Sequence, residues 1–209
     1  MHMREIGSGD PAFPEAMRLY ETSFPPVERK AEGTIVAMLQ RGDYHLYVAL
    51  EEGSVVGLAT LCLFEDLKAA CLDYLAIAPS RQGVGLGTLL FSHALGEAVR
   101  HIPDALGMLL EIQREDLAAD PGERKLREAR LRFYRRLGAR LITRSYFMPP
   151  QSGTEPEEVY LMILPTAHCT FDRGTMRELV WALHSRVYGY GRKDLLERTE
   201  KELPERLEV

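Results

Sequence analysis

The feature that most constrains the fold is an apolar run that ends in a turn with three glycines at alternate positions. Cys71 to Ala78 has the length and apolar composition of a buried strand. The segment Gly83 to Gly87 follows with the pattern G-x-G-x-G, and Leu89 to Arg100 has helical character. A strand, a glycine-rich turn and a helix in this order are typical of an α/β protein.

Such a turn is suited to holding an anion. Glycine has no Cβ and reaches positive φ at low cost, so neighbouring backbone N–H groups can converge on one point. The free N–H groups and partial positive charge of the following helix N-terminus add to this site, which suits a pyrophosphate. Arg81 can contribute a charge-assisted contact. A tight structural turn without a ligand is the alternative.

Two familiar phosphate-binding patterns do not fit this turn. A P-loop requires a lysine after its last glycine, and Thr88 follows Gly87 instead. A dinucleotide fingerprint requires G-x-G-x-x-G, and Thr88 or Leu90 stands at the third glycine position. That fingerprint also usually follows the first strand of its domain, whereas this turn follows the fourth predicted strand.

Helices and strands are mixed along the whole chain. Strands are predicted at Met3–Ile6, Tyr44–Leu50, Val55–Phe64, Cys71–Ala78, Gly107–Ile112, Leu141–Ile142 and Val159–Leu164. Helices are predicted from a cap at Asp10-Pro11 to Ser23, at Val27–Arg41, Leu89–Arg100 and Leu126–Leu137, and after a cap at Asp172. Loops are predicted at Arg114–Glu123 and Pro149–Pro156. The hairpin formed by the second and third strands favours a partly antiparallel, mixed sheet.

Composition excludes several classes of protein. The chain has 209 residues, 45% of them apolar, and its longest nearly unbroken apolar stretch is ten residues, Val55 to Phe64. A membrane-spanning helix needs about 20 apolar residues. The first ten residues lack an apolar core, which argues against a signal peptide. A net charge of −5 disfavours nucleic acid as a partner. Three cysteines without metal spacing predict a reduced, cytoplasmic protein.

Several motifs together resemble the GNAT family of N-acetyltransferases. Gln82-x-x-Gly85-x-Gly87 resembles the family's Q/R-x-x-G-x-G/A signature, and Leu75 to Pro79 resembles its "LAV-x-P" strand. Leu109 to Ile112 is similar to its "L-x-L-E-V" strand. Arg130 to Ala139 resembles its "FY-x-x-x-G-F" helix end, although Ala139 stands where phenylalanine is common.

The resemblance implies a GNAT acyl-CoA N-acyltransferase fold over residues 1–166. Residues 167–209 exceed the family's minimal fold and form a C-terminal helical extension, in which Trp181 is a natural anchor. The apolar stripe of this extension must be buried either on its own domain or on a second subunit, as in a homodimer. The connection between Gln113 and Lys125 is longer than is usual in the family.

The resemblance also implies acetyl-CoA as co-substrate and no metal. The backbone of the strand before the glycine turn would hold the pantetheine arm, and the turn would hold the pyrophosphate. The residues that the resemblance assigns to acetyl-CoA are Leu75, Ala76, Ile77, Arg81, Gln82, Gly83, Val84, Gly85, Leu86, Gly87, Thr88, Phe133 and Tyr134.

Acetyl transfer to an amine needs a proton acceptor, because a free alkyl amine is mostly protonated at neutral pH. Glu111 is the first candidate for this base, since it interrupts an apolar strand, and Asp73 is the second for the same reason. Removal of the proton through ordered water is a further alternative, and so is a purely structural role for Glu111. Tyr134 would protonate the departing thiolate. Core packing beside Phe133 is the alternative for Tyr134.

The acceptor site is less constrained. In the family, the connection between the first two helices commonly borders the acceptor. The resemblance therefore makes Phe24, Glu28 and Arg29 candidates for acceptor binding, together with Glu111 and Tyr146. The predicted function is acetyl transfer to a primary amine of a small molecule or peptide. Two alternatives stay open: a non-catalytic acyl-CoA sensor and a transferase of longer acyl chains.

Overall fold

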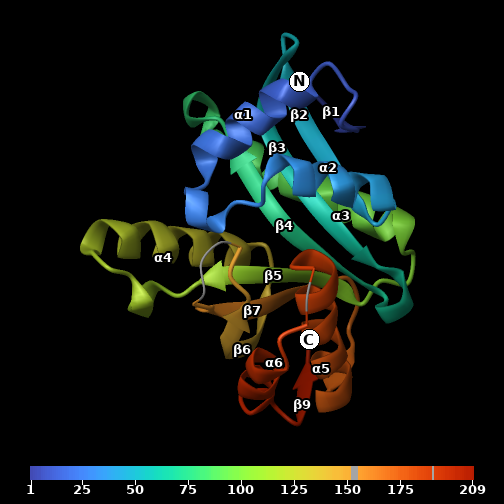
Figure 1. Cartoon of the computed structure of the whole chain (residues 1–209), viewed down its shortest axis with the longest axis vertical. Helices are drawn as coiled ribbons and strands as arrows, with labels where there is room; N and C mark the ends of the chain where they lie inside the picture. The colour runs from blue at the N-terminus through green and yellow to red at the C-terminus, as the bar shows by residue number, and fades with distance from the viewer. Residues whose placement is uncertain (152–154, 190) are drawn as a thin grey trace. The chain divides into compact units, whose positions relative to one another are not determined.

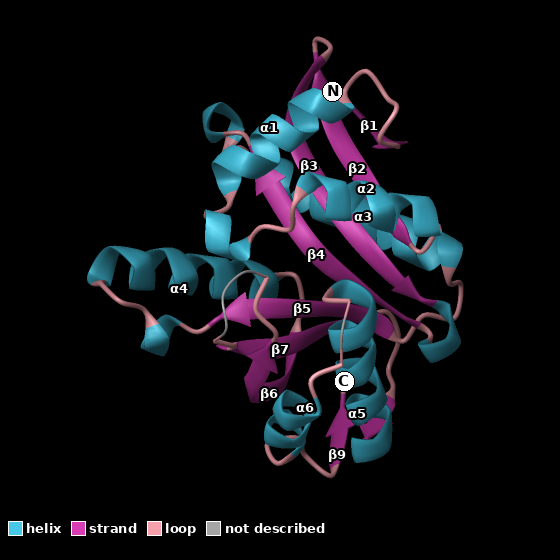
Figure 2. Cartoon of the chain, in the orientation of Figure 1, coloured by secondary structure: helices cyan, strands magenta, loops and turns pink. Residues whose placement is uncertain are grey.

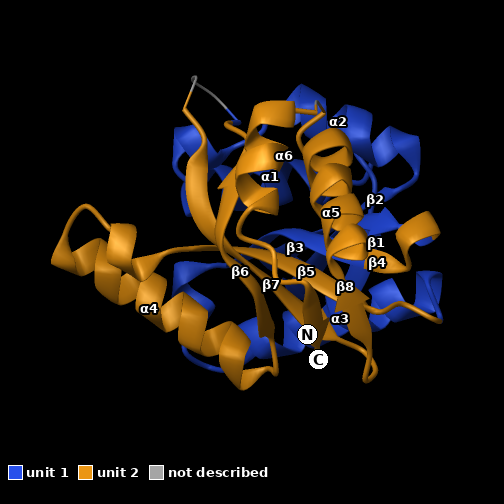
Figure 3. Cartoon of the chain, turned by 90° about the horizontal axis from the view of Figure 1, so that it is seen from below, with its two compact units in different colours: residues 1–65, 70–103, 151–153 blue, residues 66–69, 104–150, 154–209 orange. Residues whose placement is uncertain are grey.

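The computed structural model describes residues 1–151, 155–189 and 191–209, which form two compact units (Figure 3). Of these residues, unit 1 comprises Met1–Glu65, Ala70–Pro103 and Gln151. Unit 2 comprises Asp66–Ala69, Asp104–Pro150 and the described part of the chain after residue 154. The predicted loop Pro149–Pro156 contains residues 152–154, and that part of the prediction lies outside the described residues.

Unit 1 contains four strands in chain order. They are β1 (His2–Ile6), β2 (Tyr44–Glu51), β3 (Ser54–Phe64) and β4 (Ala69–Ile77). β1 pairs antiparallel with β2, and β2 pairs antiparallel with β3. The β2–β3 turn has positive φ at both Glu52 and Gly53, as a two-residue hairpin turn requires. The predicted hairpin is therefore confirmed.

Helices cover both faces of these strands (Figures 1 and 2). α1 (Phe13–Ser23) and α2 (Glu32–Arg41) lie on one face, and α3 (Leu86–His101) lies on the other. The predicted helix Val27–Arg41 was too long at its start. Pro26–Glu28 form a separate 3-10 turn (η1), and Arg29 and Ala31 are extended, so α2 begins only at Glu32.

The start of α1 also differs from the prediction. Ala12, not Asp10, is the N-cap residue, and Phe13 begins the helix. The Asp10 carboxylate instead accepts hydrogen bonds from the Arg4 guanidinium and from the Ala12 N–H. These bonds hold the pKa of Asp10 near 2.

Unit 2 contains three strands in the order β5-β7-β6, both pairs antiparallel. They are β5 (Gly107–Gln113), β6 (Arg140–Met148) and β7 (Glu157–Pro165). β6 is longer than the two-residue strand that the sequence predicts, and two register shifts interrupt its pairing with β7. The bulged pairing explains why its apolar pattern is weak in the sequence.

Gly107 begins β5 at a position that leaves no room for a side chain against β7. A Cβ at this position would lie 2.6 Å from the Leu164 carbonyl oxygen and 2.8 Å from Ile163 Cγ1. We expect Gly107→Ala to lower the free energy of unfolding by about 1–3 kcal/mol, because a backbone atom must move. Gly96→Ala, in open space within α3, should raise it by up to about 1 kcal/mol. Urea unfolding of both variants tests this contrast, and equal effects would contradict it.

Helix α4 (Pro121–Arg136) begins five residues before the predicted start at Leu126. The Asp120 carboxylate accepts from the Glu123 N–H, and the Glu123 carboxylate accepts from the Ala119 N–H, which forms a reciprocal cap. Gly138 follows the helix with φ +100, as the prediction of a terminating glycine requires.

The C-terminal region is helical, as predicted, and belongs to unit 2. The Asp172 carboxylate caps α5 (Arg173–Ala182) by accepting from the Thr175 N–H. A π-helical turn, η5 (Leu183–Val187), and α6 (Lys193–Glu200) follow. Short strands β8 (Thr170–Asp172) and β9 (Arg206–Glu208) pair with each other.

α6 contacts β6, where the Thr199 hydroxyl accepts from the Phe147 N–H at 3.1 Å. Trp181 of α5 stays 40% exposed. The predicted domain boundary after residue 166, and burial of the helical extension on a second subunit, stay predictions.

Among the described residues, none of the helices combines the length and apolar character that crossing a bilayer requires.

Candidate functional site

The glycine turn of unit 1 has the backbone conformation of an anion cradle. Gly83 (φ +77) and Gly85 (φ +88) are left-handed, and Gly85 is the N-cap residue of α3. The first helical bond runs from the Leu89 N–H to the Gly85 carbonyl, so earlier N–H groups of the helix have no acceptor within it. A Cβ at Gly83 or Gly85 would meet nothing within 4 Å, and Val84 is 65% exposed. The turn is open to a ligand.

Arg81 and Gln82 hold this turn in place. Gln82 Nε2 donates to the Ile77 carbonyl at 3.0 Å, which ties the turn to the end of β4. Arg81 forms an ion pair with Glu51 of the hairpin at 2.7 Å, and both side chains are partly exposed. The structure thus gives Arg81 a protein partner, and a contact with a bound anion would require sharing or exchanging it.

The predicted pantetheine strand is the C-terminal part of β4. Ala76 is buried, whereas Leu75 and Ile77 are half-buried. The Ala78 N–H donates to the Val56 carbonyl, so the strand end is fixed by β3 just before the turn. The remaining predicted residues, Leu86, Gly87 and Thr88, form the first turn of α3.

Asp73 lies in a buried polar cluster of unit 1 that the sequence does not predict. Lys30 Nζ is 2.8 Å from both carboxylate oxygens, and the two side chains are 2% and 4% exposed. The Tyr44 hydroxyl donates to Asp73 Oδ2 at 2.5 Å. Burial and the Asp73 charge raise the pKa of Tyr44 well above its usual value, so the phenol keeps its proton. This carboxylate is held by two donors, which favours a structural role over that of a base.

Removing Lys30 tests that role. Lys30→Met should lower the free energy of unfolding by about 3–5 kcal/mol, because it leaves a buried carboxylate without its counter-charge. The double variant Lys30→Met/Asp73→Asn should recover much of that loss and retain turnover. Lys68→Met, which breaks an exposed ion pair with Asp104, should cost less than about 1 kcal/mol. A stable double variant without turnover would instead make Asp73 catalytic.

An aromatic cluster packs the predicted acceptor residue Phe24, which follows α1, against Tyr74 of β4. Its ring centroid is 4.9 Å from Tyr74 and 5.4 Å from Tyr20. The Tyr74 hydroxyl donates to the Glu28 carbonyl at 2.8 Å, so η1 is fixed to β4 as well. Burial raises the pKa of Tyr20 to about 12, and it also raises the pKa of Tyr74. Both phenols therefore stay neutral.

The third predicted acceptor residue of this segment, Arg29, is placed differently. Its guanidinium donates to the Glu21 carbonyl near the end of α1 at 3.0 Å. The structure therefore brings Phe24 and the Glu28 backbone to β4, and turns the Arg29 side chain toward the end of a helix.

Glu111 is half-buried in the middle of β5 in unit 2. Its carboxylate oxygen Oε2 accepts a hydrogen bond from the Tyr188 hydroxyl at 2.8 Å. Tyr188 directly follows η5 in the C-terminal region. The sequence gives no signal for this contact, because 77 residues separate the two side chains.

Tyr134 and Tyr146 are both buried in unit 2. Tyr134 lies in the last turns of α4, is 7% exposed, and its ring contacts that of Phe133 at 5.0 Å in an edge-to-face arrangement. Tyr146 of β6 has no exposed surface and contacts His184 of η5, with 5.6 Å between the ring centroids. The predicted roles of these residues stay predictions.

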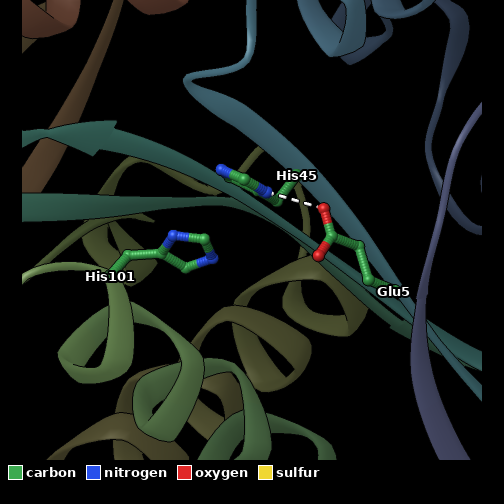
Figure 4. Close-up of side chains that lie close together, drawn as sticks. All are labelled: Glu5, His45 and His101. Carbon is green, nitrogen blue, oxygen red and sulfur yellow. Dashed lines mark hydrogen bonds and ion pairs between the residues drawn. The ribbon is translucent and has the colours of Figure 1, made fainter.

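A histidine cluster in unit 1 has ligand types that could suit a metal (Figure 4). Potential ligand atoms of Glu5, His45 and His101 all lie within 4.8 Å of one another. However, His45 Nδ1 is already 2.7 Å from Glu5 Oε1, and the Arg100 guanidinium lies 3.3 Å from His101 Nε2. A neighbouring cation disfavours a metal ion. We assign the cluster a structural role, and the prediction of no metal stays a prediction.

Comparisons with known proteins support the motif assignment. Residues 42–138 match the model of the acetyltransferase (GNAT) domain, which includes the glycine turn, Glu111 and Tyr134. No curated protein matches the chain.

Solved structures show the same fold. A GNAT family acetyltransferase from Bacteroides thetaiotaomicron superposes with a TM-score of 0.72 at 21% identity, covering 91% of this chain and 99% of its own. The ribosomal-protein-S18-alanine N-acetyltransferase of Escherichia coli gives 0.57 at 21% identity, with 80% and 95% covered. A GNAT acetyltransferase from Elizabethkingia anophelis with acetyl-CoA bound gives 0.56 at 16% identity, with 78% and 97% covered.

These similarities establish the fold: an α/β GNAT fold with C-terminal helices, as predicted. The Bacteroides match covers more of the chain than residues 1–166 could supply, so it extends into the C-terminal region. Residues 42–138 of the chain thus match a GNAT acetyltransferase domain, within a fold that the GNAT structures share.

Proposed function

We propose that this chain transfers the acetyl group of acetyl-CoA to a primary amine of a small molecule or peptide. The observation that carries the proposal is the open glycine turn between β4 and α3, with Gly83 and Gly85 in left-handed conformations. The backbone N–H groups there and the α3 N-terminus provide the positive potential that a pyrophosphate requires.

The glycine turn and the strand before it would bind most of the co-substrate, with Phe133 and Tyr134 as further contacts. The turn from Gln82 to Thr88 would hold the pyrophosphate, and its conformation fits this group because no side chain fills the cradle. The backbone from Leu75 to Ile77 would hold the pantetheine arm as an added strand. One of its N–H groups would polarise the thioester carbonyl. Bound acetyl-CoA supplies the activated acyl group.

Glu111 and Tyr134 would handle the protons. In direct transfer, the neutral amine attacks the thioester carbon, an N–C bond forms and the C–S bond breaks. Glu111 accepts the proton that the amine nitrogen loses, directly or through water. Tyr134 gives its phenolic proton to the departing thiolate and is reprotonated from solvent. Phe133 would pack beside Tyr134 and orient its ring.

The acceptor would be cationic before it loses its proton. The net charge of −5 favours such a molecule. Phe24, held against Tyr74, would supply an apolar wall for the acceptor, with Glu28, Arg29 and Tyr146 as further candidates. The Escherichia coli relative in the fold comparison is named for acting on an alanine of a ribosomal protein, so peptide amines belong in the first screen.

The test is a turnover assay with acetyl-CoA and a panel of polyamines, aminoglycosides and peptides with free amino groups. Release of the CoA thiol that depends on one amine, with a product heavier by one acetyl group, would support the proposal. Binding of acetyl-CoA without turnover on any amine would favour the sensor alternative. Faster transfer from a longer acyl-CoA with the same amine would favour a transferase of longer acyl chains.

A further inference from the structure

We propose that Tyr188, in the C-terminal region, is a positioning residue for Glu111: its hydroxyl orients the carboxylate and favours its ionised, proton-accepting form. The inference rests on the proposed function, in which Glu111 is the base. It assigns the C-terminal region, which exceeds the minimal fold of the family, a part in the chemistry. The two residues are joined by a hydrogen bond of 2.8 Å, from Tyr188 Oη to Glu111 Oε2.

The residues of β7 that lie opposite Glu111 and the adjacent same-face positions of β5 are apolar. Leu161 of β7 lies opposite Glu111 in the strand register, and Ile163 and Val159 lie opposite the next positions on the same face of β5. Burial among apolar groups disfavours a charged carboxylate, whereas a phenol that donates a hydrogen bond to the charged form favours it. Tyr188 therefore acts against the effect of burial.

The backbone holds Tyr188 in an unusual way. η5 is a π-helical turn, and it is closed by a hydrogen bond from the Tyr188 N–H to the Leu183 carbonyl at 3.3 Å. Gly189 follows with φ +79, which ends the helical path directly after the tyrosine. A π-turn inserts one extra residue into a helix and changes the direction of the side chains after it, and such turns are frequent at functional sites.

Contacts of the residues before Tyr188 hold this turn in place. Leu183 and Val187 are 0% and 2% exposed. The Arg186 guanidinium forms two hydrogen bonds of 2.6 Å with the Asp66 carboxylate, which fix η5 to the chain near residue 66. A tyrosine on such a support loses little further entropy when it orients a carboxylate.

Other titratable or charged groups on the elements packed here include His184 and Arg186 of η5, Tyr146 of β6, Tyr160 of β7, and Arg127 and Arg130 of α4. Burial lowers the pKa of His184 to about 4, so its ring is neutral near neutral pH. Tyr146 lies against His184, with 5.6 Å between the ring centroids. The opposite charges of Arg186 and Asp66 neutralise each other in an ion pair. Tyr188, which directly follows η5, donates a hydrogen bond to Glu111, so its removal should change the titration of Glu111.

The test compares the full-length wild-type chain with Tyr188→Phe by carbon-13 NMR of labelled glutamate carboxyl groups. The Glu111 resonance is identified by its loss in Glu111→Gln. We expect Tyr188→Phe to move its titration midpoint to higher pH by about one unit, as loss of a hydrogen bond to a charged group requires. An unchanged midpoint would overturn the inference. Tyr160→Phe, which removes the phenol that contacts Glu115 in the same unit, should leave the midpoint unchanged.

Kinetics separate this role from a structural one. In Tyr188→Phe the acidic limb of the kcat/KM profile should move to higher pH by the same amount, and raising the pH should restore the rate. A rate loss that is equal at every pH, with an unmoved limb, would contradict positioning. If the wild-type chain transfers acetyl to no amine, the proposed function fails, while the NMR midpoint still decides whether Tyr188 controls the charge of Glu111.

Discussion

Gly85→Asp should weaken acetyl-CoA binding at least about 100-fold, equivalent to about 2.7 kcal/mol, as measured by calorimetric titration. Gly85 has φ +88 and lies at the N-terminus of α3, where free N–H groups face open space. An aspartate there would place a carboxylate where the pyrophosphate must bind. The carboxylate would also occupy N–H groups that the pyrophosphate needs.

Gly42→Asp is the matched control for this substitution. Gly42 has φ +86, caps the end of α2 and has open space around a Cβ position. An L-residue in the left-handed region costs about 1–2 kcal/mol, so both variants should lose similar stability. Only Gly85→Asp should lose acetyl-CoA. If it binds acetyl-CoA as Gly42→Asp does, the pyrophosphate site is assigned to the wrong turn.

Tyr134→Phe should lower kcat about 100-fold or more, because general acid catalysis typically contributes 10²–10⁴-fold. Acetyl-CoA affinity should change little, since the phenol proton is needed only when the thiolate leaves. The substitution keeps the ring that contacts Phe133, so the packing of α4 is retained. Initial rates and a binding titration of the same preparation measure the two effects.

Tyr160→Phe serves again as the control, because it removes a phenol of the same unit that is engaged with Glu115. Its kcat should equal that of the wild type. A Tyr134→Phe variant with unchanged kcat would give Tyr134 a packing role only. If Tyr134→Phe instead raises KM for acetyl-CoA at constant kcat, the Tyr134 hydroxyl is a binding group.

The glycine turn could be predicted from the sequence because its signals are local. The apolar run of β4, the three glycines and the helical periodicity of α3 lie within about one supersecondary unit. The motifs around Glu111 and Tyr134 are equally short. Such segments carry their own conformational preferences, so reading them in order leads to the correct fold class.

Identical local signals nevertheless led to different structures. The dipeptide Asp-Pro begins α4, where Asp120 caps the helix and Pro121 is its first residue. At Asp10 the same dipeptide does not begin α1, because Arg4 of β1 and the Ala12 N–H occupy the carboxylate. A contact from a neighbouring strand overrode the local preference, which the sequence could not show.

The side chains around the candidate bases were not predictable. Lys30 and Asp73 are 43 residues apart, and Tyr188 and Glu111 are 77 residues apart. Neither pair has a local pattern, since each depends on how strands and helices of one unit pack. Asp73 and Glu111 look alike in the sequence, as acidic residues in apolar strands. In the structure Asp73 is held by the buried Lys30 and the Tyr44 phenol, and Glu111 accepts a hydrogen bond from the Tyr188 phenol.

The most direct test of the account is a calorimetric titration of the wild-type chain with acetyl-CoA, with CoA and with ATP. The account predicts that acetyl-CoA and CoA bind with a Kd of about 1–100 μM, and that ATP binds much more weakly. ATP shares charged phosphates but lacks the pantetheine arm that β4 would hold. If neither CoA species binds, the glycine turn is a structural feature only, and the proposed acetyl transfer is wrong.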